Sequence, residues 1–130
     1  MITIYISFIR SLLEQSAVLW HTSLTDEQSE NIERVQKAAL RIILQKEYLD
    51  YPTALEKTGL QTLYDRRTKL SLNFAKRCAK HEYMNNLFPL NQKHMYNTRK
   101  QEKYKVNYAN TSRYSNSAIP YMQRLLNKII

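Results

Sequence analysis

Five cations on one expected helix have the spacing that most clearly suggests a chemical role: Arg66, Lys69, Lys76, Arg77 and Lys80. At about 100° per residue, their side chains project within roughly 100° of arc. A row of this kind can follow a phosphate backbone, and each phosphate that it neutralises releases counterions. The row therefore predicts binding to nucleic acid that weakens with salt. The alternative interpretation is an ordinary solvated helix face.

Aromatic and cationic residues alternate in the later part of the chain. The candidate binding residues there are Arg99, Lys100, Lys103, Tyr104 and Lys105. Tyrosine rings stack on unpaired bases while cations hold the backbone, so the mixture suits single-stranded or structured RNA or DNA. The alternative is that individual tyrosines pack this segment onto a helical core.

Motifs for catalysis and for metal or cofactor binding are missing from the sequence. It offers no Ser-His-Asp order, no glycine-rich phosphate loop and no paired catalytic carboxylates. His21, His81 and His94 are too scattered for metal-ligand spacing, and Cys78 is the single cysteine. We expect no catalytic residue, no cofactor and no metal. Cys78 is expected to be a small buried hydrophobe.

Composition predicts a single helical core. The chain has 130 residues, 43% of them hydrophobic, with one glycine and three prolines. Few tight turns can be formed from so little glycine, which favours long helices over hairpins. The expected fold is all-α: a small bundle of three long helices with a short connector helix, a largely irregular basic tail and a short C-terminal helix.

The net charge of +9 is unevenly distributed. Residues 1–60 contain six lysines and arginines against eight acids, whereas residues 61–130 contain fourteen against three. An anionic partner would therefore bind the second half. The lone cysteine and the missing signal-peptide features predict an intracellular protein of the nucleus or cytoplasm, with no membrane partner.

The first helix is expected at about residues 3–20. Its apolar positions fall within about a third of the circumference. With Ser16, which falls on the same face, they are Tyr5, Phe8, Ile9, Leu12, Leu13, Leu19 and Trp20. We expect this face to be buried, with Trp20 as a core anchor and His21 as a surface or capping residue.

The second helix has the clearest start in the sequence. Thr25 as N-cap and Gln28 three residues later form a capping box, which satisfies two backbone donors. The inward stripe is expected to comprise Ile32, Val35, Ala38, Ala39, Ile42 and Ile43. On the outer face, i,i+4 ion pairs are expected between Glu30 and Arg34 and between Glu33 and Lys37.

Three further elements complete the expected organisation. Pro52 begins a short connector helix that ends at Gly59, a third helix runs over residues 62–81, and a last helix is entered through Ser117 and Pro120. The expected domains are a helical core over residues 1–88, a basic tyrosine-rich irregular segment over 89–116 and a C-terminal helix over 117–130.

Arg67 is expected to lie on the apolar side of the third helix beside Phe74, with both in structural roles. A buried guanidinium needs a partner, because an unpaired buried charge costs several kcal/mol. Glu14 and Glu56 are the candidate acids, and backbone carbonyls are the alternative.

Two runs of the sequence are RSLLEQSAVLWHTSLT (10–25) and NIERVQKAALRIIL (31–44). In this order they resemble the segment downstream of the polymerase core in non-LTR (LINE-like) retrotransposon reverse transcriptases, particularly those of the jockey-like group. Later motifs resemble it too: GLQTLYDRR (59–67), LFP (87–89) and SAIPYMQRLLN (117–127). The resemblance covers nearly the whole chain. It rests on the order and spacing of helical patterns and on no catalytic signature.

The resemblance implies an accessory piece of a polymerase that copies RNA into DNA. The family's catalytic aspartates have no counterpart in this sequence, since Tyr64-Asp65 is not their motif, and the cysteine-histidine knuckle of some relatives is also absent. The chain by itself is therefore expected to be no enzyme. Its implied partners are template RNA or target DNA and the upstream polymerase domain.

Two functional hypotheses follow. The first is a non-catalytic C-terminal accessory module or truncated fragment that helps its reverse transcriptase to hold nucleic acid. The alternative is a purely structural helical module that packs on the upstream polymerase and binds no nucleic acid. An apolar stripe left exposed on the first helix after folding would favour this alternative.

Overall fold

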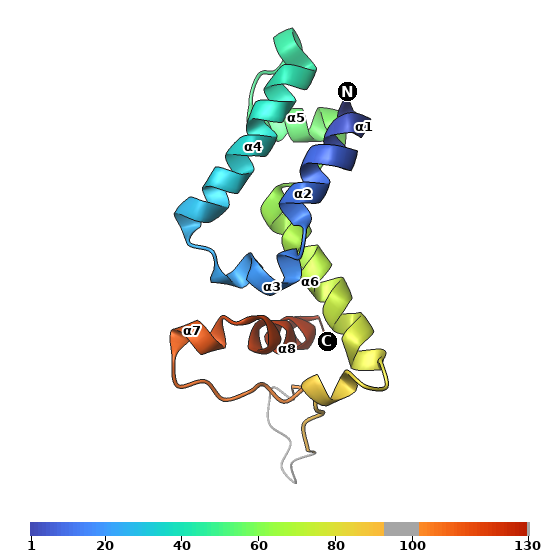
Figure 1. Ribbon diagram of the computed structural model, residues 1–130, viewed down its shortest axis with the longest axis vertical. Coiled ribbons are helices and arrows are strands. Elements are labelled where there is room, and N and C mark those ends of the chain that lie inside the picture. Colours follow the sequence, from blue (N-terminus) through green and yellow to red (C-terminus); the bar gives the residue numbers. More distant parts are fainter. Residues whose placement is uncertain (93–101, 130) are drawn as a thin grey trace. The chain divides into compact units, whose positions relative to one another are not determined.

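The computed structural model describes residues 1–92 and 102–129, and these residues form an all-α structure, as predicted (Figure 1). Within them the only extended pairing is an isolated bridge between Leu90 and Tyr104. The chain divides into two compact units. Unit 1 comprises Met1–Ala17 and Leu24–Lys69, and unit 2 comprises Val18–Ser23 and Leu70–Ile130. The units therefore do not follow the predicted segments 1–88, 89–116 and 117–130.

The predicted first helix is interrupted. It consists of α1 (Ile2–Ile4), a π-helical stretch (Tyr5–Arg10) and α2 (Ser11–Glu14). After Gln15 the helical backbone ends, and Ser16 has a positive φ of 54°. The chain resumes as α3 (Ala17–Trp20) and a 3-10 turn (His21–Ser23).

The wider turn of the π-helical stretch explains why the predicted inward face is wrong. A π-helix bonds i to i+5, so residues three apart, such as Tyr5 and Phe8, no longer share one direction as they would on an α-helix. Tyr5 is buried, but Phe8, Ile9 and Leu12 are exposed. Leu19, beyond the break, is exposed as well.

In unit 1, α4 (Asp26–Leu44) begins at the predicted capping box. Thr25 Oγ1 accepts the Gln28 amide at 3.2 Å, and Gln28 Oε1 accepts the Thr25 amide at 3.0 Å. The predicted inward stripe of α4 is wrong for three of its six residues, while Ile32, Ala39 and Ile43 are half-buried. The helix buries Glu33, Gln36 and Leu40 instead, while Val35, Ala38 and Ile42 are exposed.

The predicted ion pairs of α4 are also wrong. Lys37 Nζ pairs with Glu30 Oε1 at 2.6 Å, and Arg34 bonds the side chain of Asn31 at 3.2 Å. Glu33 is unavailable for a surface pair because α4 turns it inward.

The remaining helices of unit 1 begin and end close to their predicted positions. α5 (Tyr51–Thr58) has Pro52 in its first turn and ends at Gly59, whose φ of 67° suits a left-handed cap. Asp50 caps it by accepting the Thr53 amide at 2.8 Å. α6 (Leu63–Lys80) follows, and its residues up to Lys69 belong to unit 1.

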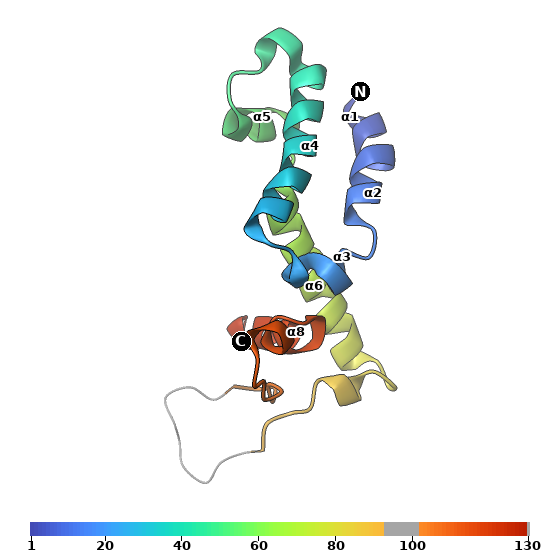
Figure 2. The same ribbon diagram turned by 60° about the vertical axis from the view of Figure 1, so that its left-hand side comes forward.

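Unit 2 is built from the second half of α6, the chain after it and α8 (Ala118–Lys128). Its core cluster is Ala75, Cys78, Phe88, Met122 and Leu126. Figure 2 shows α8 beside α6, as this cluster requires. Cys78 is buried in it as predicted.

Two short elements of unit 2 differ from the sequence expectation. A single helical turn, α7 (Ser112–Ser115), lies in the segment expected to be irregular, and Thr111 caps it by accepting the Tyr114 amide at 3.2 Å. His21 is buried and not at the surface, because its ring meets Tyr121 edge to face at 5.9 Å between centroids. Trp20, the expected anchor, is half-buried.

Among the described residues, no single helix is long and apolar enough to cross a bilayer. The segments Ile2–Glu14 and Ala17–Ser23, taken together across their break, reach the length and composition of a span.

Candidate functional site

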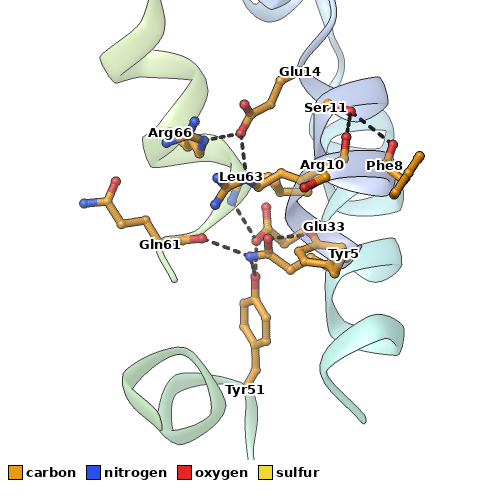
Figure 3. A network of polar contacts seen from close by, with 12 residues as sticks. Tyr5, Phe8, Arg10, Ser11, Glu14, Glu33, Tyr51, Gln61, Leu63 and Arg66 are labelled. Atoms are coloured by element: carbon orange, nitrogen blue, oxygen red, sulfur yellow. Dashed lines mark hydrogen bonds and ion pairs between the residues drawn. The ribbon is translucent and has the colours of Figure 1, made fainter. Parts of the chain in front are cut away.

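A buried polar network joins the helices of unit 1, and Gln36 is its centre. The Gln36 side chain is fully buried. Its Oε1 accepts the Tyr5 hydroxyl at 2.8 Å, and its Nε2 donates to the Tyr51 hydroxyl and to the Gln61 carbonyl, each at 2.9 Å. One amide therefore fixes the first helix, α5 and the start of α6 to α4 (Figure 3).

Glu33, one turn from Gln36, extends the network. Its Oε1 accepts the Tyr51 hydroxyl and the backbone amide of Leu63, the latter at 3.0 Å. The Leu63 amide lies in the first turn of α6, where no carbonyl within the helix is available to it. Glu33 therefore acts as a cap for α6 from a neighbouring helix.

Burial raises the pKa of both tyrosines of the network. It raises the pKa of Tyr5 to about 12; the charge of Arg10 opposes this rise, and the Glu33 and Glu14 carboxylates each add a smaller contribution to it. The pKa of Tyr51 is raised mainly by burial and then by its hydrogen bond to Glu33. Both hydroxyls are neutral donors at physiological pH, as the network requires.

Arg67 is fully buried, as predicted. Its guanidinium donates to Ser29 Oγ at 2.9 Å. Glu14 pairs with other arginines, and Glu56 is exposed. Burial lowers the pKa of Arg67, and the largest opposing effect is the charge of Glu33, with smaller contributions from Tyr64 and Glu14. Arg67 is thus a structural residue of unit 1.

Arg66 is one of the predicted nucleic-acid-binding residues, but an acid already engages it. Its Nε pairs with Glu14 Oε1, and Arg10 approaches the same oxygen at 3.6 Å (Figure 3). The Glu14 side chain is only 12% exposed. An arginine held in this way is a poor phosphate ligand, because releasing it would break its ion pair with a carboxylate that is largely removed from solvent.

The other four cations of the predicted row are exposed along α6: Lys69, Lys76, Arg77 and Lys80. The ion pairs found within residues 1–92 and 102–129 involve none of them. The Arg77 guanidinium lies 6.0 Å from the Phe74 ring centroid. Phe74 itself packs against the core of unit 2. These side chains are available to an anionic partner.

The predicted residues of the tail have different surroundings. Lys103 and Lys105 are exposed, whereas Tyr104 is half-buried and packs on the core of unit 2. Arg99 and Lys100 lie outside the described residues. The packing interpretation therefore fits Tyr104.

An exposed apolar row on the first helix was missed as a site by the sequence argument. Ile4, Phe8 and Leu12 follow one another at four-residue intervals and are 59%, 69% and 71% exposed. We call these three residues the N-terminal apolar row. Periodicity alone assigned Phe8 and Leu12 to the core, and only the π-helical turn separates them from Tyr5. Large apolar side chains grouped on a surface are typical of an interaction site.

No group of histidine, cysteine and acidic residues within the described part of the chain has the arrangement of a metal site. Comparison of the sequence with models of known families and with curated proteins, and of the structure with solved structures, found no match.

Proposed function

We propose that this chain is a non-catalytic helical accessory module of a retrotransposon reverse transcriptase, and that its N-terminal apolar row packs on the upstream polymerase domain. The observation that carries the proposal is the exposure of Ile4, Phe8 and Leu12 on a helix that is otherwise held firmly by Tyr5. The family resemblance supports the choice of partner.

Burial of this row would contribute substantial binding energy. Full burial of a large apolar side chain is worth about 1.5–3 kcal/mol relative to exposure. Three neighbours on one rigid helix can form the central anchor of an interface. A domain joined ahead of Met1 would lie within a few residues of the row.

The test is co-expression of residues 1–130 with the polymerase domain encoded upstream in the same reading frame. We expect the two to co-elute in size-exclusion chromatography. The double substitution Phe8→Lys/Leu12→Lys should raise Kd by about 100-fold, the size expected for loss of two anchor residues. Thr3→Lys/Ser7→Lys is the matched control, because both positions are exposed and polar on the same helix.

Equal binding by the two double variants would contradict the proposal, as would the absence of an in-frame polymerase sequence upstream. Thermal melts of both variants serve as the folding check, since Phe8 and Leu12 contribute little buried area in the chain alone.

A second candidate function is contact with template RNA or target DNA through the exposed cations of α6. It is favoured by the exposure of Lys69, Lys76, Arg77 and Lys80 and by their lack of acid partners among the described residues. Binding to single-stranded RNA or duplex DNA should then weaken steeply as salt increases. The reversal Lys69→Glu/Lys76→Glu/Lys80→Glu should reduce affinity at low salt by about tenfold or more and flatten the salt dependence.

The matched control reverses three exposed cations elsewhere: Arg34→Glu/Lys46→Glu/Lys128→Glu. It changes the net charge equally, so a general electrostatic effect would weaken both triple variants alike. Affinity that is absent at low salt, or equal in the two variants, would remove this candidate.

A further inference from the structure

Unit 2 contains an open pocket of about 500 Å³, within the size range of small-molecule sites. It lies where the chain after α6 meets the strand-like pairing of Leu90 with Tyr104. The residues important for its chemistry are Asn85, Asn86, Phe88, Leu90, Lys103 and Tyr104. All belong to the described part of unit 2.

One wall of the pocket is held by α8 and by the core. Gln123 Nε2 donates to the Leu87 carbonyl at 2.8 Å, and the Gln123 side chain is fully buried. Phe88 is buried in the core cluster, and its amide bonds the Asn85 carbonyl at 2.9 Å. This wall therefore keeps its shape without a ligand.

A second wall is held by two hydrogen bonds between the Asn127 side chain and the backbone of Tyr104. Asn127 Oδ1 accepts the Tyr104 amide at 2.9 Å, and Asn127 Nδ2 donates to the Tyr104 carbonyl at 2.9 Å. Lys105 donates its amide to the Pro89 carbonyl at 2.8 Å, which joins this wall to the first. A pocket built on such supports is preorganised, so little entropy is lost in ordering it when a ligand binds.

The side chains that line the pocket differ in chemistry. Phe88 and Leu90 provide an apolar surface, and the Tyr104 ring adds an aromatic one. The carboxamides of Asn85 and Asn86 make no hydrogen bond with the rest of the described chain, so their donors and acceptors are available. The Lys103 ammonium lies 5.5 Å from the Tyr104 ring centroid. No acid is among the lining residues that the structure describes.

A ligand that matches this pocket has a flat apolar body, a polar edge with both donors and acceptors, and a negative charge. Nucleobases combine the first two properties, since they stack on aromatic rings and bond amides along their edges. A phosphate supplies the third. We propose that the pocket binds a nucleoside monophosphate, either free or as one unit of a single strand, with Asn86 at the base and Lys103 at the phosphate.

This inference goes beyond docking of the first helix and does not depend on it. Where the source is a strand, it deepens the second candidate function by adding base recognition to the contacts of α6. The two can be separated, because Lys69, Lys76 and Lys80 do not line the pocket.

The test is calorimetric titration of the full chain with the four nucleoside 5′-monophosphates. At least one should bind in the micromolar to millimolar range. Lys103→Ala should raise its Kd by about tenfold, the usual effect of losing one charge-assisted hydrogen bond, and leave binding of the corresponding nucleoside unchanged. Asn86→Leu should weaken nucleotide and nucleoside alike.

Matched controls are Lys105→Ala and Asn110→Leu, an exposed cation and an exposed amide outside the pocket. They should bind within twofold of the unmodified chain. Absence of binding by all four monophosphates, or equal effects of Lys103→Ala and Lys105→Ala, would overturn the proposal.

Competition with a single-stranded octanucleotide distinguishes the two sources of the ligand. If the pocket holds one unit of a strand, the octanucleotide displaces the monophosphate and Asn86→Leu weakens both. If the ligand is a free nucleotide, the octanucleotide does not displace it. In either case, the triple charge reversal on α6 should leave monophosphate binding unchanged. A negative result for nucleic-acid binding by α6 can therefore be distinguished from a negative result for nucleotide binding by the pocket.

Discussion

Arg67→Ala should destabilise unit 1 by about 3 kcal/mol or more, with a fall in Tm of about 10 °C. Two effects add. The substitution removes the hydrogen bond to Ser29 and leaves a cavity where a fully buried side chain was packed. It also removes a positive charge that interacts with buried Glu33. Urea and thermal denaturation followed by far-ultraviolet circular dichroism would measure the change.

Lys69→Ala is the control for Arg67→Ala, because it removes a long exposed cation from the same helix. Its effect should stay within about 0.5 kcal/mol. A double-mutant cycle of Arg67→Met with Glu33→Gln would isolate the charge effect, and we expect a coupling of about 1 kcal/mol or more. A loss below about 1 kcal/mol for Arg67→Ala would show that the guanidinium is dispensable.

Gln36→Leu should cost about 2–4 kcal/mol, although it replaces a buried polar side chain by an apolar one of similar volume. Replacing a buried polar side chain by an apolar one is harmless only where its hydrogen-bonding partners are replaced by apolar groups as well. Here the Tyr5 hydroxyl loses its acceptor and the Gln61 carbonyl loses its donor. The buried Tyr5 hydroxyl, left unsatisfied, costs about 1–3 kcal/mol, and the lost hydrogen bonds to Tyr51 and Gln61 add to this. The expected midpoint of urea denaturation is therefore well below that of the unmodified chain.

Tyr5→Phe distinguishes this network effect from simple loss of packing. Alone, it should cost about 1 kcal/mol, because it removes one hydrogen bond and keeps the ring. The double variant Tyr5→Phe/Gln36→Leu should lose less stability than the sum of the two single losses, because no Tyr5 hydroxyl is then left without an acceptor. Strict additivity would mean that the two side chains do not act together.

The termini of the helices could be predicted because they are decided locally. Thr25 and Gln28 form their capping box with no help from distant residues, and Gly59 ends α5 because its φ of 67° suits glycine. The same holds for Asp50, which sequence reasoning did not name. Motifs of this kind involve residues only a few positions apart.

The buried face of α4 could not be predicted in this way. Val35 and Ile42 are the more apolar choice, yet Glu33 and Gln36 are buried because Tyr5, Tyr51 and Gln61 bring matching groups to them. Those partners lie 15 to 31 positions away in the chain. A hydrophobicity pattern cannot reveal a polar interior whose complementarity comes from other helices.

The candidate sites were predicted in part. Four of the five cations of α6 are exposed, but Arg66 is held by Glu14, fifty-two positions away. The apolar row was hidden by the π-helical stretch, and the pocket by the pairing of Leu90 with Tyr104. These three features depend on contacts between distant residues or on a backbone irregularity, and neither can be predicted from residue types.

The path of the chain has a consequence for how this protein can be divided. It passes between the two compact units three times, after Ala17, after Ser23 and within α6 after Lys69. No single cut yields either unit whole: a fragment ending near residue 69 would carry His21 without Tyr121, and one starting near residue 70 would carry Tyr121 without His21. In genetic terms, recombination at a single point cannot transfer either unit whole, because residues 18–23 of unit 2 are encoded between the two parts of unit 1.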